Sequence, residues 1–158
     1  MTLTPTRCLV LACGNTLRED DGIGPFLAQW AEERFAAEPG VRIVSSHQWT
    51  PELSEEIAAA DSVLFVDCSI NAAPGSVTLR DVEAAAEIPR MMTHHLDAAG
   101  LLILASEYFG KQPRTAQLLT IGAASLELRE GFSPAVEAAM REAQRTLAEA
   151  VRRLIAAE

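Results

Sequence analysis

Acidic and imidazole side chains gather in a few short segments of this 158-residue sequence. Asp20 and Asp21 follow a Gly-Asn pair at 14–15, Asp67 ends an apolar run, and two adjacent histidines stand at 94–95. Carboxylates and an imidazole from separate loops would form a facial ligand set for Ni, Fe, Zn or Mn, with positions left open for a substrate. The residue types therefore allow metal-assisted chemistry if the fold brings these segments together.

Each of these groups also has a purely structural interpretation. Asp20 or Asp21 could cap the helix that follows, but one helix start needs one cap, which leaves the other aspartate for function. Asp67 could serve in a turn. A phosphate-binding turn fits the first loop poorly, because Glu19 and the two aspartates would repel an anion.

No conventional nucleophile or phosphate motif is present. The sequence has no Gly-x-Ser-x-Gly elbow, no His-Glu-x-x-His pair and no Walker-type loop. Cys8 lies inside an apolar run and is expected in the core, whereas Cys13 and Cys68 end two predicted strands near the candidate site. An odd cysteine count without a Cys-x-x-Cys pair fits a reducing cytoplasm, and a thiol protease is not expected.

Length and composition predict one globular domain over residues 1–158, since a domain typically has about 150 residues. Hydrophobic residues make up 49% and charged residues 22%, which excludes disorder and a disulfide-stapled miniprotein. The net charge of −9 argues against nucleic acid or an anionic membrane as main partner. No apolar run could span a bilayer and no signal peptide is evident, so we expect a soluble cytoplasmic monomer.

Apolar runs alternate with helical patterns along the chain. We predict buried strands at 7–13, 41–46, 62–67 and 118–123, and a half-exposed, antiparallel edge strand at 76–82. We predict helices at 24–38, 50–60, 95–109 and from 134 onward, with Thr50 and Ser133 as caps and Gly110 as a stop. This order predicts a three-layer α/β/α sandwich, with a mostly parallel, five-stranded twisted sheet between helices on both faces.

The predicted topology places the chemically competent segments together. In an open α/β sheet, ligands bind beyond the carboxyl ends of the strands, near the point where the strand order reverses. The segments 14–24, 47–49 and 67–69 each follow a predicted strand, and the histidine pair precedes a helix. We therefore expect the aspartates of the first loop, Asp67 and a histidine to converge.

The segment from Leu9 to Gly24 resembles the opening signature of the nickel–iron hydrogenase maturation endopeptidases. That signature is a strand, Gly-Asn, four variable residues, two acidic residues and then x-x-Gly. The resemblance continues through Phe-Val-Asp at 65–67, Thr-His-His-Leu at 93–96 and Gly-Phe-Ser-Pro-Ala-Val at 131–136. It therefore covers nearly the whole chain.

The resemblance implies a cytoplasmic endopeptidase with an α/β/α fold, whose partner is the hydrogenase large-subunit precursor. Members of the family remove a short C-terminal extension once nickel has been inserted, which lets the new C-terminus close the metal site. The implied ligand is Ni²⁺ supplied by the substrate, so no tightly bound cofactor is expected in the free protein. Carried over by position, the implied catalytic and nickel-binding residues are Asp21, Asp67 and His94.

The match departs from the family pattern after the second strand. Many members read Gly-Gly-Thr there, whereas this chain reads His-Gln-Trp-Thr at 47–50, so its precursor specificity is expected to differ. His47 is a candidate additional ligand, and His95 competes with His94, although one residue along a helix turns a side chain by about 100°. We expect substrate contacts from Gly14, Asn15, Asp20, His47, Gln48 and Trp49.

The implied mechanism is metal-assisted hydrolysis of one peptide bond. Substrate-borne Ni²⁺ would polarise the scissile carbonyl or lower the pKa of a bound water, with Asp20 or Asp21 as general base. Two other functions stay open on the sequence: a non-catalytic, nickel-dependent chaperone of the large subunit, and a flavodoxin-like small-ligand binder at the Gly14-Asn15 turn. The acidic first loop argues against the small-ligand binder.

Overall fold

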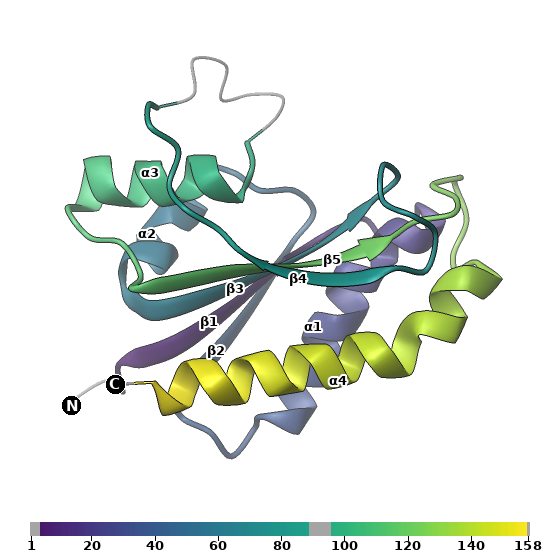
Figure 1. Ribbon diagram of the computed structural model, residues 1–158, viewed down its shortest axis with the longest axis horizontal. Coiled ribbons are helices and arrows are strands. Elements are labelled where there is room, and N and C mark those ends of the chain that lie inside the picture. Colours follow the sequence, from purple (N-terminus) through teal and green to yellow (C-terminus); the bar gives the residue numbers. More distant parts are fainter. Residues whose placement is uncertain (1–3, 89–95, 158) are drawn as a thin grey trace.

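The computed structural model describes residues 4–88 and 96–157 (Figure 1). A five-stranded sheet with the order β2-β1-β3-β5-β4 forms its centre. The strands are β1 (Thr6–Cys13), β2 (Val41–Ser46), β3 (Ala60–Ser69), β4 (Val77–Asp81) and β5 (Thr115–Gly122). All neighbouring pairs are parallel except β4 with β5, so the predicted mostly parallel sheet with an antiparallel edge is confirmed.

Helices cover both faces of the sheet, which confirms the three-layer arrangement. The helices α1 (Ile23–Arg34) and α4 (Pro134–Ala156) pack on one face, and α2 (Leu53–Ala58) and α3 (Ala98–Phe109) pack on the other (Figure 1). A short 3₁₀ helix, η1 (Glu19–Gly22), precedes α1 and was not predicted. None of the helices in the described ranges combines the length and apolarity that crossing a bilayer requires.

The strands between the helical layers are buried on both faces. On β1, Cys8, Val10 and Ala12 join the cluster under α1 and α4, whereas Leu9 and Leu11 join the cluster under α2 and α3. Alternating side chains of one strand thus serve two cores, which explains the continuous apolar runs in the sequence. The predicted core position of Cys8 is confirmed, and burial raises the pKa of its thiol to about 11.

The boundaries of the first three helices differ from the sequence prediction. The first helix ends at Arg34 because Phe35 turns into the core, well before the Pro-Gly pair at 39–40. Thr50 is not a cap: α2 begins at Leu53, its N-cap Glu52 makes no side-chain capping bond, and Ser54 donates its hydroxyl to a backbone carbonyl instead.

The caps of the last two helices follow the usual chemistry. Asp97 caps α3 by accepting from the backbone N–H of Gly100 at 2.8 Å, so that helix begins after the predicted position 95. Gly110 ends α3 in the left-handed conformation, and Ser133 caps α4, as the sequence predicts.

The third strand is longer than predicted at both ends. It begins at Ala60, which the sequence assigned to a helix, and its last three residues pair with β5 at Thr120, Ile121 and Gly122. Asp67, predicted as the last residue of this strand, therefore lies two residues before its end. This pairing fixes the backbone of Asp67 at the carboxyl edge of the sheet.

Candidate functional site

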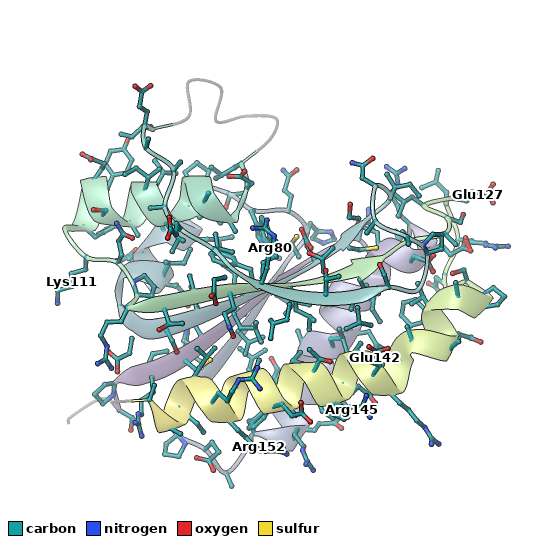
Figure 2. The ribbon with its side chains drawn as sticks, in the orientation of Figure 1. Arg80, Lys111, Glu127, Glu142, Arg145 and Arg152 are labelled. Carbon is teal, nitrogen blue, oxygen red and sulfur yellow. The ribbon has the colours of Figure 1, made fainter. Side chains whose placement is uncertain are left out.

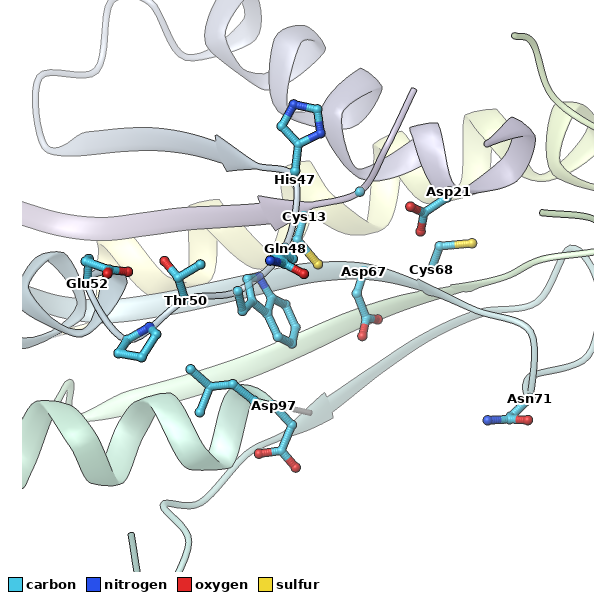
Figure 3. Close-up of a pocket in the computed structure, with 14 residues that line it drawn as sticks. Cys13, Asp21, His47, Gln48, Thr50, Glu52, Asp67, Cys68, Asn71 and Asp97 are labelled. Atoms are coloured by element: carbon cyan, nitrogen blue, oxygen red, sulfur yellow. The ribbon is translucent and has the colours of Figure 1, made fainter. Parts of the chain in front are cut away.

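A pocket of about 1040 Å³ opens at the carboxyl ends of β1, β2 and β3 (Figure 3). β1 lies between β2 and β3 in the sheet. The chain therefore passes from β1 to the neighbouring strand β2 on one side, and then crosses back to form β3 on the other side of β1. Such a reversal of strand order leaves a crevice between the loops, where α/β proteins bind ligands. The ends of β1 and β3 and the loops after β1, β2 and β3 line this pocket.

Asp21 reaches the pocket from η1. Its carboxylate oxygen Oδ2 accepts from the backbone N–H of Asn15 at 2.7 Å, which holds the loop after β1 in a tight return. Asn15 itself does not line the pocket, because its side chain accepts from the N–H of Leu17 at 2.9 Å. The loop therefore presents the second of the two adjacent aspartates to the pocket.

Gly14 makes this return possible. Its φ of +153° is rare for residues with side chains, and a Cβ at this position would lie 2.0 Å from the carbonyl oxygen of Asp21. The Asp21 backbone thus occupies the space in which other residues carry a side chain. Gly14 lines the pocket, as predicted for a substrate contact, and its visible role is to let Asp21 approach.

We expect Gly14→Ala to destabilise the protein by at least about 3 kcal/mol, because both the backbone conformation and the Asp21 carbonyl oppose a Cβ. Urea denaturation measures the loss. Gly110→Ala is the matched control, since Gly110 also has a positive φ, +71°, but a Cβ there meets nothing within 4 Å. Its loss should be near 1 kcal/mol. Equal losses in the two variants would contradict the close approach of Asp21.

Asp67 occupies the neighbouring strand end and is partly buried. The hydroxyl of Thr120 donates to its Oδ1 at 2.9 Å. Burial raises the pKa of Asp67 to about 6, against the lowering effects of the Thr120 hydrogen bond and the Arg80 charge; Asp21 adds a smaller raising effect. A carboxyl group that titrates near neutral pH inside a cleft is typical of functional sites.

Two thiols lie among these carboxylates. Cys13 and Cys68 both line the pocket, and Figure 3 shows Cys68 near Asp21 and Asp67. Burial, reinforced by the negative charges of Asp21 and Asp67, raises the pKa of each thiol to about 12. Because the thiolate is the reactive form, neither cysteine is prepared to act as a nucleophile.

Asp20 points away from the pocket and is fully buried. Its carboxylate accepts hydrogen bonds from the backbone N–H groups of Ala124, Ser125 and Ser133, at 2.8, 3.1 and 2.7 Å, and from the Ser133 hydroxyl at 2.8 Å. Burial opposes the charge, but these hydrogen bonds prevail and lower the pKa of Asp20. The structure thus gives Asp20 a structural role instead of the predicted substrate contact.

The two helix-capping interpretations of the adjacent aspartates are also wrong. The N-cap residues of η1 and α1 are Arg18 and Gly22, and no side chain caps either helix through a hydrogen bond. Asp20 instead joins the loop after β1 to the segment 124–133. Beside it, the buried carboxylate of Glu19 pairs with Arg129, which lowers the pKa of Glu19 and forms a second connection to the same segment.

The loop after β2 forms one wall of the pocket. His47, Gln48 and Trp49 all line it, as predicted, and the Trp49 ring packs edge-to-face on Phe65 with centroids 5.4 Å apart. The imidazole of His47 points away from Asp67 in Figure 3, so this conformation does not join the two groups. Thr50, the last residue of the segment that departs from the family pattern, lines the pocket too. Lining residues to which the sequence assigned no role at the site are Pro51, Glu52, Asn71, Leu96 and Asp97.

The predicted third ligand, His94, and its neighbour His95 lie outside the described residues. Within residues 4–88 and 96–157, no three His, Cys, Asp or Glu side chains are grouped closely enough to hold a metal ion. The two described members of the predicted set, Asp21 and Asp67, do share the pocket.

No family model matches the chain, but the known proteins to which its sequence is similar are all named for hydrogenase maturation or formation. The chain is 29% identical to the hydrogenase 2 maturation protease of Escherichia coli over 149 residues, covering 92% of this chain and 91% of the relative. It is 30% identical over 156 residues to the hydrogenase expression/formation protein HoxM of Azotobacter vinelandii, covering 93% of this chain and 75% of that protein.

Solved structures with the same fold lead to the same group of proteins. The hydrogenase maturating endopeptidase HybD of E. coli superposes with a TM-score of 0.71 and 26% identity, covering 94% of this chain and 93% of HybD. The maturation protease HycI of Thermococcus kodakarensis has a TM-score of 0.67 over 96% of this chain and 94% of its own, at 24% identity. At that identity, HycI supports the fold alone.

Proposed function

The chain belongs to the hydrogenase maturation protease family, and from this premise we propose that it removes the C-terminal extension of a nickel-loaded hydrogenase large-subunit precursor. The observation that carries the proposal is the pairing of Asp21 and Asp67 in one open pocket at the reversal of strand order. A cleft of this kind admits a peptide segment beside two carboxylates.

Recognition would depend on nickel carried by the substrate. Asp21 and Asp67 offer oxygen ligands, and His94 would add a nitrogen ligand, a combination that suits Ni²⁺. Two carboxylates and one imidazole make a weak site alone, so ligands from the precursor would have to complete the coordination. A precursor without nickel would then lack the feature that the protease recognises.

Hydrolysis would require an acceptor for the proton of the attacking water. Asp67 suits this role when Asp21, His94 and the precursor hold the nickel and leave its carboxylate free, because a base is most effective when its pKa lies near the working pH, and its pKa is about 6. Asp20 is unsuited, because four hydrogen bonds already occupy its carboxylate. Nickel in the substrate would supply Lewis-acid assistance to the scissile carbonyl or to the water.

The test is to incubate the purified protein with nickel-loaded and nickel-free precursor and to measure intact masses. We expect loss of a C-terminal peptide from the loaded form alone. Asp21→Asn should slow this cleavage by about 100-fold or more, because it removes the charge while its amide oxygen still accepts from Asn15. Asp61→Ala, at an exposed position outside the pocket, is the control and should cleave at the native rate.

Other results would reject parts of the proposal. Equal cleavage of both precursor forms would remove nickel recognition. Nickel-dependent complex formation without any cleavage would instead identify a chaperone of the large subunit.

A further inference from the structure

A second groove lies between α1 and α4, the two helices that cover one face of the sheet. Its volume is about 340 Å³, and it shares no lining residue with the pocket described above. The residues that line it are Trp30, Arg34, Arg141, Gln144, Arg145, Ala148 and Arg152. Four of the chain's 13 Lys and Arg residues thus gather in one concavity of a protein whose net charge is −9.

In the part of the chain that the structure describes, these arginines form no ion pair with an acidic side chain. Across residues 4–88 and 96–157, the only ion pairs are Arg42 with Glu56 and Arg129 with Glu19. Glu137, Glu142 and Glu149 stand three or four residues from these arginines along α4, but their carboxylates form no ion pair with them in the structure. The guanidinium groups are therefore available for an external anion.

The arginines are arranged in a line. Arg141, Arg145 and Arg152 fall on one stripe of α4, and Arg34 with Trp30 forms the facing wall from α1. At 1.5 Å per residue, the stripe extends for about 16 Å, the length of about five residues of extended peptide. Figure 2 shows Arg145 and Arg152 at separate points along α4. A single phosphate would need donors that converge on one point, whereas this line fits an extended, repeatedly charged ligand.

We propose that this groove binds a short acidic segment of a protein partner. Guanidinium groups form bidentate, charge-assisted hydrogen bonds with carboxylates. The indole of Trp30 offers an apolar surface for the methylene groups of glutamate side chains. Nucleic acid fits less well, because the short groove belongs to a protein whose overall negative charge repels a long phosphate backbone.

Fluorescence anisotropy with a labelled hexaglutamate peptide tests the proposal. We expect the native protein to bind the peptide and the affinity to fall as salt is raised, because the contacts are ionic. The double variant Arg141→Glu/Arg145→Glu should weaken binding by about tenfold or more, and Arg34→Ala, on the opposite wall, should weaken it less. Arg153→Glu is the matched control: it is exposed on α4 but does not line the groove, so its affinity should stay within about twofold of native.

Three outcomes would overturn the proposal. They are no binding of the peptide by the native protein, equal weakening in Arg153→Glu, and tighter binding of a single-stranded oligonucleotide than of the peptide. Circular dichroism of each variant checks that it is folded. If the double variant does not fold, the weaker peptide binding expected of Arg34→Ala still tests the proposal. Because the groove is separate from the pocket, processing of the precursor by these variants distinguishes this inference from the proposed function.

Discussion

Asp67→Asn is expected to slow precursor processing by about 10²- to 10⁴-fold and, at the same time, to make the folded protein more stable at neutral pH. The first effect follows from the proposed function, since asparagine can neither take a proton nor bind a metal ion as a carboxylate does. The second follows from burial, which raises the pKa of Asp67 from 3.8 to about 6. Slower processing together with higher stability is the result expected for a residue that is unfavourable for folding but needed for the reaction.

The stability effect has a definite dependence on pH. The folded protein holds the Asp67 proton more tightly than the unfolded chain, so the stability contribution of this group is full below about pH 4 and is lost as the pH rises through about 6. The asparagine variant lacks this loss. Above pH 6 it should gain up to about 3 kcal/mol over the native protein, because one pKa unit corresponds to 1.36 kcal/mol.

Urea denaturation of both proteins at pH 4 and pH 7.5 measures this difference, and single-turnover processing over pH 5–8 measures the activity. Native processing should fall below about pH 6, where Asp67 becomes protonated. Thr120→Val provides a second readout: it removes the hydrogen bond that lowers this pKa, so the activity midpoint should move to higher pH. A native activity profile without a change near pH 6 would exclude Asp67 as the ionised group.

Asp20→Ala is expected to produce the largest loss of stability, about 3–5 kcal/mol, although Asp20 does not line the pocket. The substitution removes the acceptor of three backbone N–H groups, of which that of Ser133 is buried and those of Ala124 and Ser125 are partly buried. Asp20→Asn should be nearly as damaging, because all the partners are donors and an amide nitrogen would face at least one of them. Since the folded-state pKa of Asp20 is lowered, its contribution is present above about pH 4 and is lost as the pH falls further.

Ser133→Ala is the graded comparison for Asp20→Ala. It removes the hydroxyl bond to Asp20 and the cap of α4, but it keeps the backbone N–H that donates to Asp20. A loss of about 1–2 kcal/mol is expected in urea denaturation. If Asp20→Ala lost no more than Ser133→Ala, the three backbone hydrogen bonds would not have the importance assigned to them.

The sheet, its antiparallel edge and the two helical layers could be predicted because they follow from local patterns: continuous apolar runs for the buried strands, alternation for the edge strand, and apolar residues at helical spacing for the helices. Asp21 and Asp67 could be brought together because parallel strands end at one edge of a sheet. Both inferences need only the order of the elements. They do not require knowledge of any particular contact between distant residues.

The remaining features depend on such contacts. The partners of Asp20 lie 104 to 113 residues later in the sequence, and no local pattern distinguishes this aspartate from a helix cap. The extension of β3 beyond Asp67 likewise depends on its pairing with β5. At Thr50, a good local capping signal was overridden because α2 begins later.

The connection between Asp20 and Ser133 also sets an order of events during synthesis. Ser133 is synthesised 113 residues after Asp20. Until then, the loop after β1 lacks the N–H and hydroxyl groups of Ser133 that bind the Asp20 carboxylate. Forming that contact early would require closure of a long loop, which is slow and entropically unfavourable. We therefore expect β1, β2 and β3 to assemble first and Asp21 to reach its place only when α4 packs, so that the emerging protein stays inactive until the segment 124–136 has been made.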